Sequence, residues 1–167
     1  MEKYYFAEDE IDGIRLFIIT SSKGIRSITF HSIDKTIPAE SLTRLRPNDP
    51  YLLDSFKQLR EYFALKRKVF DLTLDIIGTD FQKKVWQELT KIPYSETISY
   101  KELAIRLGNI ESIRAVGRAN GANPIPIVIP CHRVIGANGK LVGYGGGLKI
   151  KEKLLEIEGS RSLELFN

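Results

Sequence analysis

The first third of the chain alternates short apolar runs with turn residues. Runs rich in Ile and Phe cover residues 4–6, 15–20 and 25–30, and Gly13 and Ser22-Lys23-Gly24 separate them. Glycine and serine between apolar runs of this length are typical of turns that connect neighbouring strands. We therefore expect an antiparallel meander, with residues 69–74 as a further strand. Residues 33–48 show no period and predict an irregular connection.

Helical spacing first appears at Asp49-Pro50, since proline suits the first turn of a helix. From there to about Leu65, apolar side chains repeat at helical intervals and form one stripe, which consists of Leu53, Phe56, Leu59 and Phe63. This spacing predicts one helix packed against the sheet.

From Thr79 onward the pattern is mostly helical. Thr79-Asp80-Phe81-Gln82 and Ser99-Tyr100-Lys101-Glu102 are capping boxes, which start helices by satisfying the first backbone amides. The second of these helices is expected to end near Leu107, before Gly108-Asn109, and another to cover residues 112–121. Two short helices joined by a glycine-containing turn predict a helix-turn-helix at about 99–121. A final helix is expected over 148–158.

These patterns predict an α+β protein, and a length of 167 residues suits one domain or two small ones. We expect an N-terminal domain over 1–78, with a small antiparallel sheet and a helix. A mostly helical C-terminal domain with the helix-turn-helix is expected over 79–167. No apolar run approaches the roughly 20 residues that span a bilayer, and the N-terminus has no leader pattern, so a cytoplasmic protein is expected.

Positive charge is concentrated in one part of the chain. Residues 1–78 hold 12 basic and 12 acidic side chains, whereas residues 97–151 hold eight basic and two acidic ones, a net charge of +6. Such an excess suits a phosphate backbone. A solvated basic face is the alternative that charge alone leaves open.

The chain has a single cysteine, Cys131, and two histidines, His31 and His132. One cysteine excludes an internal disulfide and makes the common structural zinc sites unavailable, so no metal and no cofactor is expected. A lone cysteine is by default a small buried apolar residue. Here, however, a histidine and Arg133 follow it directly, and residues 123–130, with three prolines, are expected to run extended and buried toward it.

Neighbouring positive charge favours the thiolate, which is the reactive form of cysteine. His132 would need a partner to fix its tautomer, and Glu158 in the final helix is the candidate.

These residues resemble the O6-alkylguanine-DNA alkyltransferases, also called methylated-DNA–protein-cysteine methyltransferases. Pro130-Cys131-His132-Arg133-Val134 looks like the active-site motif of that family, and the resemblance extends from about Thr79 to Gly159. It includes Ser99-Tyr100, Arg114-Ala115-Val116-Gly117, Asn123-Pro124-Ile125-Pro126, Gly143-Tyr144-Gly145-Gly146-Gly147-Leu148 and Leu154-Leu155-Glu156-Ile157-Glu158-Gly159. The first 78 residues match only in general character, and the resemblance implies a ribonuclease H-like fold there.

The resemblance implies direct reversal of DNA damage in a single turnover. Cys131 would accept the alkyl group from O6 of guanine, or from O4 of thymine, and keep it. His132 would deprotonate the thiol through a water, and Glu158 would hold the imidazole. Asn123 would brace the turn before the active-site segment, and Tyr100 would donate a proton to guanine N3. Read without the family, Asn123 is a capping residue and Tyr100 a packed aromatic.

The same resemblance implies that a monomer binds the minor groove of double-stranded DNA and swings the damaged nucleotide outward. Arg114 would fill the gap in the stack, although by itself it reads as a surface arginine. The remaining implied DNA contacts are Tyr100, Lys101, Asn109, Ala115 and Gly117. The pocket would include Pro126, Val134, Tyr144 and Gly145, with backbone carbonyls of Cys131 and Val134 and the amide of Gly145 contacting the base.

Two other classes of protein compete with this interpretation. The first is a non-catalytic protein that recognises alkylguanine in DNA, whose relatives lack the acceptor cysteine. The second is a cysteine hydrolase, in which the base usually lies far along the chain from the nucleophile. The adjacent position of Cys131 and His132 counts against the hydrolase.

Overall fold

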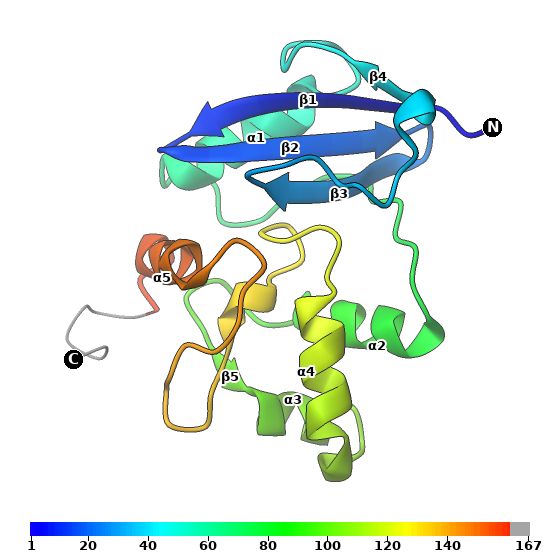
Figure 1. Ribbon diagram of the computed structural model, residues 1–167. Helices are drawn as coiled ribbons and strands as arrows, with labels where there is room; N and C mark the ends of the chain where they lie inside the picture. Colours follow the sequence, from blue (N-terminus) through cyan, green and yellow to red (C-terminus); the bar gives the residue numbers. More distant parts are fainter. Residues whose placement is uncertain (161–167) are drawn as a thin grey trace. The chain divides into compact units, whose positions relative to one another are not determined.

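The structure is a computed structural model, and it describes residues 1–160. The chain folds into two compact units, the first from Met1 to Ile77 and the second beginning at Gly78. The first unit contains a sheet and one α-helix, and the second is mainly helical (Figure 1). The predicted α+β class is therefore confirmed. None of the helices in the described part of the chain has the length and apolar character needed to cross a membrane.

The sheet of the first unit has four strands in the order β3-β2-β1-β4. The strands β1 (Tyr4–Ile11), β2 (Ile14–Ser21) and β3 (Gly24–Phe30) form the predicted antiparallel meander. The fourth, β4 (Leu42–Arg44), follows a single 3₁₀ turn, η1 (Ala39–Ser41), and pairs parallel to β1. The sheet is thus mixed. The strand β4 lies in the segment that was expected to be irregular, because three residues are too few to show a period and their partner strand is distant in the sequence.

Helix α1 (Leu53–Phe63) lies along one face of this sheet (Figure 1). Its predicted stripe is confirmed at Phe56, Leu59 and Phe63, which are buried, but is wrong at Leu53, the first residue of the helix, which is 47% exposed. The helix ends before Leu65, whose φ of 60° is left-handed and cannot continue an α-helix. The strand predicted over 69–74 is wrong apart from one isolated bridge between Ile25 and Leu74.

The helices of the second unit begin close to the predicted residues. They are α2 (Asp80–Leu89), α3 (Tyr100–Arg106), α4 (Ile113–Gly121) and α5 (Leu148–Ile157), with 3₁₀ turns η2 (Ile110–Ser112) and η3 (Cys131–Arg133). The first capping box is complete, because the Thr79 hydroxyl accepts from the Gln82 amide and the Gln82 side chain accepts from the Thr79 amide. Ser99 caps α3 by accepting from the amide of Glu102.

Two contacts bring the helix pair α3 and α4 to the cysteine segment. The indole of Trp86 on α2 donates to the carbonyl of Ala119 on α4 at 2.8 Å, which fixes α4 against α2. The short strand β5 (Ile98–Ser99) runs directly into α3 and pairs in parallel with β6 (Val134–Ile135), which directly follows η3. As a result, the first residue of α3 lies beside the segment that carries Cys131.

The segment 123–130 is not helical, as its prolines require, but the expected extended run is wrong. It folds back on itself, with the amide of Ile129 donating to the carbonyl of Ile125 at 2.9 Å and a left-handed φ of 74° at Ile127. The Asn123 side chain closes this turn: its Oδ1 accepts from the Ile125 amide, and its Nδ2 donates to the Ile129 carbonyl at 2.8 Å. The three isoleucines of the turn, Ile125, Ile127 and Ile129, are buried.

Candidate active site

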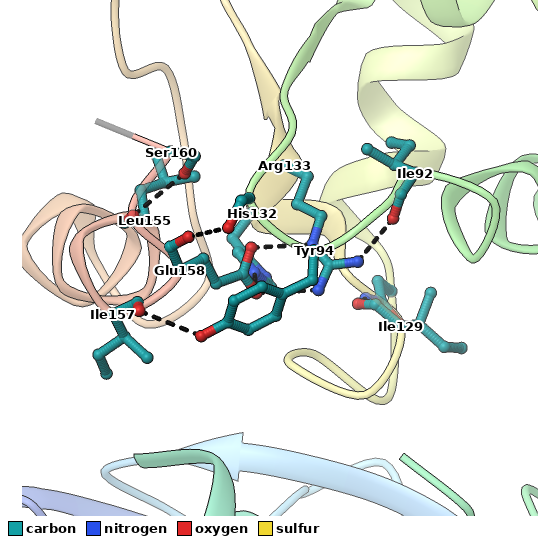
Figure 2. A network of polar contacts seen from close by, with 11 residues as sticks. Ile92, Tyr94, Ile129, His132, Arg133, Leu155, Ile157, Glu158 and Ser160 are labelled. Atoms are coloured by element: carbon teal, nitrogen blue, oxygen red, sulfur yellow. Dashed lines mark hydrogen bonds and ion pairs between the residues drawn. The ribbon is translucent and has the colours of Figure 1, made fainter. Parts of the chain in front are cut away.

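A buried cluster of ionisable side chains joins η3 to the end of α5 (Figure 2). The Nε2 atom of His132 lies 2.7 Å from Oε1 of Glu158. Arg133 forms a bidentate interaction with the same carboxylate: its Nε donates to Oε2 and its Nη2 to Oε1, each at 2.9 Å. Its third nitrogen, Nη1, donates to the carbonyl of Ile92 at 2.6 Å. Glu158 is therefore held from two sides at once.

The electrostatics of the cluster fix the protonation states. Burial alone would raise the pKa of Glu158, but hydrogen bonds from His132 and Arg133 lower it to about 2, so the group is a carboxylate at neutral pH. Burial lowers the pKa of His132 below its usual value, although Glu158 acts in the opposite direction. His132 is therefore a neutral imidazole that donates Nε2–H to the carboxylate, which leaves Nδ1 unprotonated and able to accept a proton.

Cys131 directly precedes this histidine and is 5% exposed. Burial raises the pKa of its thiol to about 11, while the Asn123 side chain and the charge of Lys151 act against that shift. The cysteine is thus a protonated thiol at neutral pH and needs a base before it can act as a nucleophile. The Nδ1 atom of His132 is buried and has no hydrogen-bond partner among residues 1–160.

A cavity of about 700 Å³ opens beside the cysteine. Its wall is made by the start of α3, one face of α4 and the glycine-rich loop before α5: Tyr100, Ile113, Arg114, Gly117, Arg118, Asn120, Gly121, Val142, Gly143, Tyr144 and Gly145. Cys131 is not part of this wall. Asn120 connects the two, because it lines the cavity and its Nδ2 donates to the Cys131 carbonyl at 3.4 Å. The backbone of Cys131 is therefore one hydrogen bond away from a residue of the cavity wall.

Tyr100 is half-buried and lines this cavity. Its hydroxyl donates to the carbonyl of Val142, another lining residue, at 3.2 Å. Burial raises the pKa of Tyr100, and the negative charge of a Cys131 thiolate would raise it further. At neutral pH the hydroxyl is consequently a proton donor close to the cysteine.

The predicted site residues divide into two groups. Tyr100, Arg114, Gly117, Tyr144 and Gly145 share the cavity wall. Cys131, His132 and Glu158 are buried outside that wall, and the half-buried side chain of Asn123 reaches the thiol of Cys131. Those outside the cavity wall are Pro126 and Val134, which are buried, Lys101 and Asn109, which are exposed, and Ala115, which lines a separate hollow between α2 and α4.

Asn109 has a local structural task, since its side chain caps η2 by accepting from the amide of Glu111. The residues described include no group of three or more His, Cys, Asp or Glu side chains that could hold a metal ion.

Sequence reasoning missed three residues of the site. Arg133 was noted only as a neighbouring charge, and its two-pronged contact with Glu158 was not foreseen. No sequence pattern indicated a role for Asn120, which lies near the end of α4. Lys151 was counted as one of several basic residues, although it is fully buried and donates to two backbone carbonyls near the cavity. It lies three residues before Leu154 and four before Leu155, and this helical spacing places it on the buried stripe of α5. The spacing could therefore have predicted that Lys151 is buried.

Comparison with known proteins agrees with this geometry. The family model described as 6-O-methylguanine DNA methyltransferase, DNA binding domain, matches residues 80–160, and the ribonuclease-like domain of the same family matches residues 15–76. A methylated-DNA–protein-cysteine methyltransferase of Methanosarcina barkeri is 46% identical over 145 residues, which cover 86% of this chain and 89% of that protein. Its counterpart in Mycobacterium tuberculosis is 52% identical over 130 residues, covering 76% of this chain and 79% of that protein.

Solved structures resemble the whole chain. The crystal structure of the Mycobacterium tuberculosis O6-methylguanine methyltransferase has a TM-score of 0.84 at 39% identity and covers 95% of this chain and 94% of its own. A structure of the Mycobacterium tuberculosis OGT in complex with DNA has a TM-score of 0.83 at 40% identity, with 98% and 99% covered. With both domain models matched and the single cysteine set beside a buried His–Glu pair, the chain belongs to the 6-O-methylguanine DNA methyltransferase family.

Proposed function

We propose that this protein repairs DNA by moving an alkyl group from O6 of guanine onto the sulfur of Cys131. The observation that carries the proposal is the buried 2.7 Å contact between His132 and Glu158, directly beside the only cysteine of the chain. Relatives that share about half of their residues with this chain are named methylated-DNA–protein-cysteine methyltransferases, and a structural relative is a complex with DNA.

The chemical step begins with a neutral thiol and a neutral imidazole. His132 Nδ1 takes the thiol proton, through a bridging water, while Glu158 stabilises the imidazolium that forms. The thiolate attacks the alkyl carbon, a carbon–sulfur bond forms, and the bond between that carbon and O6 breaks. The electron pair passes to the guanine, and the Tyr100 hydroxyl donates a hydrogen bond or proton at N3 to assist its departure.

The product on the protein is a thioether, which water does not displace. One molecule of protein therefore repairs one lesion, unlike a hydrolytic enzyme with the same kind of base and orienting carboxylate. The high pKa of the Cys131 thiol, about 11, fits this scheme, because the sulfur is inert until a base removes its proton.

Access to O6 requires the nucleotide to leave the base stack, which costs a few kcal/mol that DNA contacts must return. Arg114 is exposed at the start of α4 on the cavity wall and would occupy the gap left in the duplex. Ala115 and Gly117 would let α4 approach the minor groove closely, and Lys101 and Asn109 would contact the backbone. The protein would act as a monomer.

Inside the cavity the base would lie against Tyr144 and Gly145. The Gly145 amide would donate to O6, and the carbonyls of Cys131 and Val134 would accept from the guanine amino group. Pro126 would support this wall from behind.

A protein that binds alkylguanine without removing the alkyl group is the second candidate. The cysteine argues against it, since such a protein has no use for an acceptor sulfur paired with a buried base. Intact mass spectrometry after incubation with duplex DNA that carries O6-methylguanine separates the two.

We expect the wild-type protein to gain the mass of a single methyl group in place of hydrogen, and the Cys131→Ser variant to gain nothing while still binding the DNA. Binding by the wild type without any gain in mass would reject the transfer and favour recognition alone.

A further inference from the structure

Lys151 is a fully buried lysine in the first half of α5. Its Nζ atom donates to the carbonyl of Val134 at 2.7 Å and to the carbonyl of Val142 at 3.1 Å. These two carbonyls stand at the two ends of residues 135–141, the segment that leaves the cysteine turn and returns as the cavity wall. One ammonium group thus ties both ends of that segment to α5.

The Val142 carbonyl has a second donor, the hydroxyl of Tyr100 at 3.2 Å. Lys151 Nζ is also 5.9 Å from the centre of the Tyr100 ring, so the tyrosine, the lysine and the carbonyl form one compact group. Tyr100 and Val142 both line the cavity. The Tyr100 hydroxyl is therefore hydrogen bonded to the backbone at Val142 and must turn from it to reach a nucleobase.

We propose that Lys151 is a positioning residue for the alkyl transfer, which keeps the Val142 carbonyl hydrogen bonded when the Tyr100 hydroxyl turns from that carbonyl to the flipped base. A carbonyl shared by two donors can release one of them at small cost. A carbonyl that loses its only donor in a partly buried place is destabilised, and the hydroxyl would then stay where it is.

The second hydrogen bond of Lys151, to the Val134 carbonyl, has a related effect. The Val134 carbonyl has two lone pairs, so it can accept from Lys151 and still accept from the amino group of the base. Lys151 would hold this carbonyl in one orientation before the base arrives. The inference rests on the proposed function of the site, in which Tyr100 donates to the departing guanine.

A double-mutant cycle tests the coupling between the two side chains. The rate of methyl uptake from duplex DNA with O6-methylguanine is measured by rapid quenching and intact mass for the wild type, Lys151→Met, Tyr100→Phe and the double variant. We expect Lys151→Met to slow the wild-type reaction about thirtyfold, the effect of one hydrogen bond from a charged group. In the Tyr100→Phe background the same change should slow it less than about threefold, because no hydroxyl remains to be released.

Lys149→Met is the matched control, since Lys149 lies on the same helix and is exposed. It should react at the wild-type rate. Thermal unfolding is recorded first, and if Lys151→Met does not fold, the cycle is run with Lys151→Gln, which keeps an amide donor; a smaller loss that again disappears in the Tyr100→Phe background is then expected.

Equal slowing by the lysine substitution in both backgrounds would overturn the inference, because a purely structural role is additive. Unchanged rates in all lysine variants would overturn it as well. Absence of methyl uptake by the wild type is a different result, which would reject the proposed function itself.

Discussion

Glu158→Gln changes one atom type in the centre of the buried cluster and tests the whole arrangement. The glutamine has the same size but no charge, and its amide nitrogen cannot accept a hydrogen bond. In the native protein the two carboxylate oxygens receive one contact from His132 and two from Arg133, at 2.7 to 2.9 Å. The substitution therefore leaves the Arg133 guanidinium without its counter-charge.

The expected loss of stability can be worked from two directions. Arg133 is 7% exposed, and removing one partner of a buried ion pair costs about 3–5 kcal/mol. Independently, the contacts lower the pKa of Glu158 from 4.5 to about 2, and each pKa unit corresponds to about 1.4 kcal/mol, so they favour the charged form by roughly 3 kcal/mol. Both routes predict that the free energy of unfolding falls by about 3 kcal/mol at neutral pH.

The rate of alkyl transfer should fall as well, for a separate reason. Without the carboxylate, His132 loses the group that holds its Nε2 proton and stabilises the imidazolium. A positioned general base contributes about a hundredfold or more to the rate, so we expect methyl uptake at least about a hundredfold slower.

Urea unfolding with linear extrapolation measures the first effect, and quenched intact mass the second. Glu156→Gln is the matched control, because Glu156 is an exposed glutamate on the same helix. The double variant Arg133→Met/Glu158→Gln separates the two effects. Replacing both charges by uncharged groups should restore most of the stability, while the transfer rate stays low. If Glu158→Gln has the same free energy of unfolding and the same rate of methyl uptake as the wild type, the assignment of Glu158 as the orienting carboxylate is refuted.

Two further predictions concern the DNA contact and the base. Arg114→Ala should slow repair of duplex DNA at least about tenfold more than reaction with the free base O6-methylguanine, which needs no nucleotide flipping; equal slowing of both would contradict the role of Arg114. Because burial keeps the pKa of His132 below 6.5, the neutral base persists as the pH falls to 6.5, and the transfer rate should decline only at lower pH. The rate of methyl uptake is measured by intact mass at each pH. A rate that is already halved at pH 7 would count against His132 as the base.

Local patterns predicted the elements that local contacts stabilise. The capping residue Thr79 and the helix that it starts were readable because both partners of the box lie three residues apart. The strand β4 was not, because its hydrogen bonds go to residues far away in the sequence. The strand predicted over 69–74 is reduced to the single bridge at Leu74, whose partner Ile25 is likewise distant. The turn after α4 was predicted as an extended run for a similar reason. Prolines exclude a helix, but the fold-back depends on the side chain of Asn123 and a left-handed Ile127.

The cysteine motif predicted the chemistry of the site, whereas the supporting charges were harder to read. Arg133 follows His132 in the sequence, yet whether it faces solvent or Glu158 depends on where α5 ends relative to η3. That relation is a matter of tertiary packing, which no spacing within a single segment reveals.

Helix α5 nevertheless contains a signal that sequence reasoning can use. Its buried stripe runs through Ile150, Leu154 and Leu155, and two charged residues, Lys151 and Glu158, occupy the same stripe seven positions apart. Burying a charge costs several kcal/mol unless it is paired or hydrogen bonded. Charged residues at positions of the buried stripe therefore predict that a partner for each charge lies nearby. In the proposed reaction, Glu158 orients the base of the cysteine and Lys151 holds two carbonyls near the cavity in place. A single helix face thereby connects both halves of the proposed reaction, proton removal from the sulfur and proton donation to the departing base.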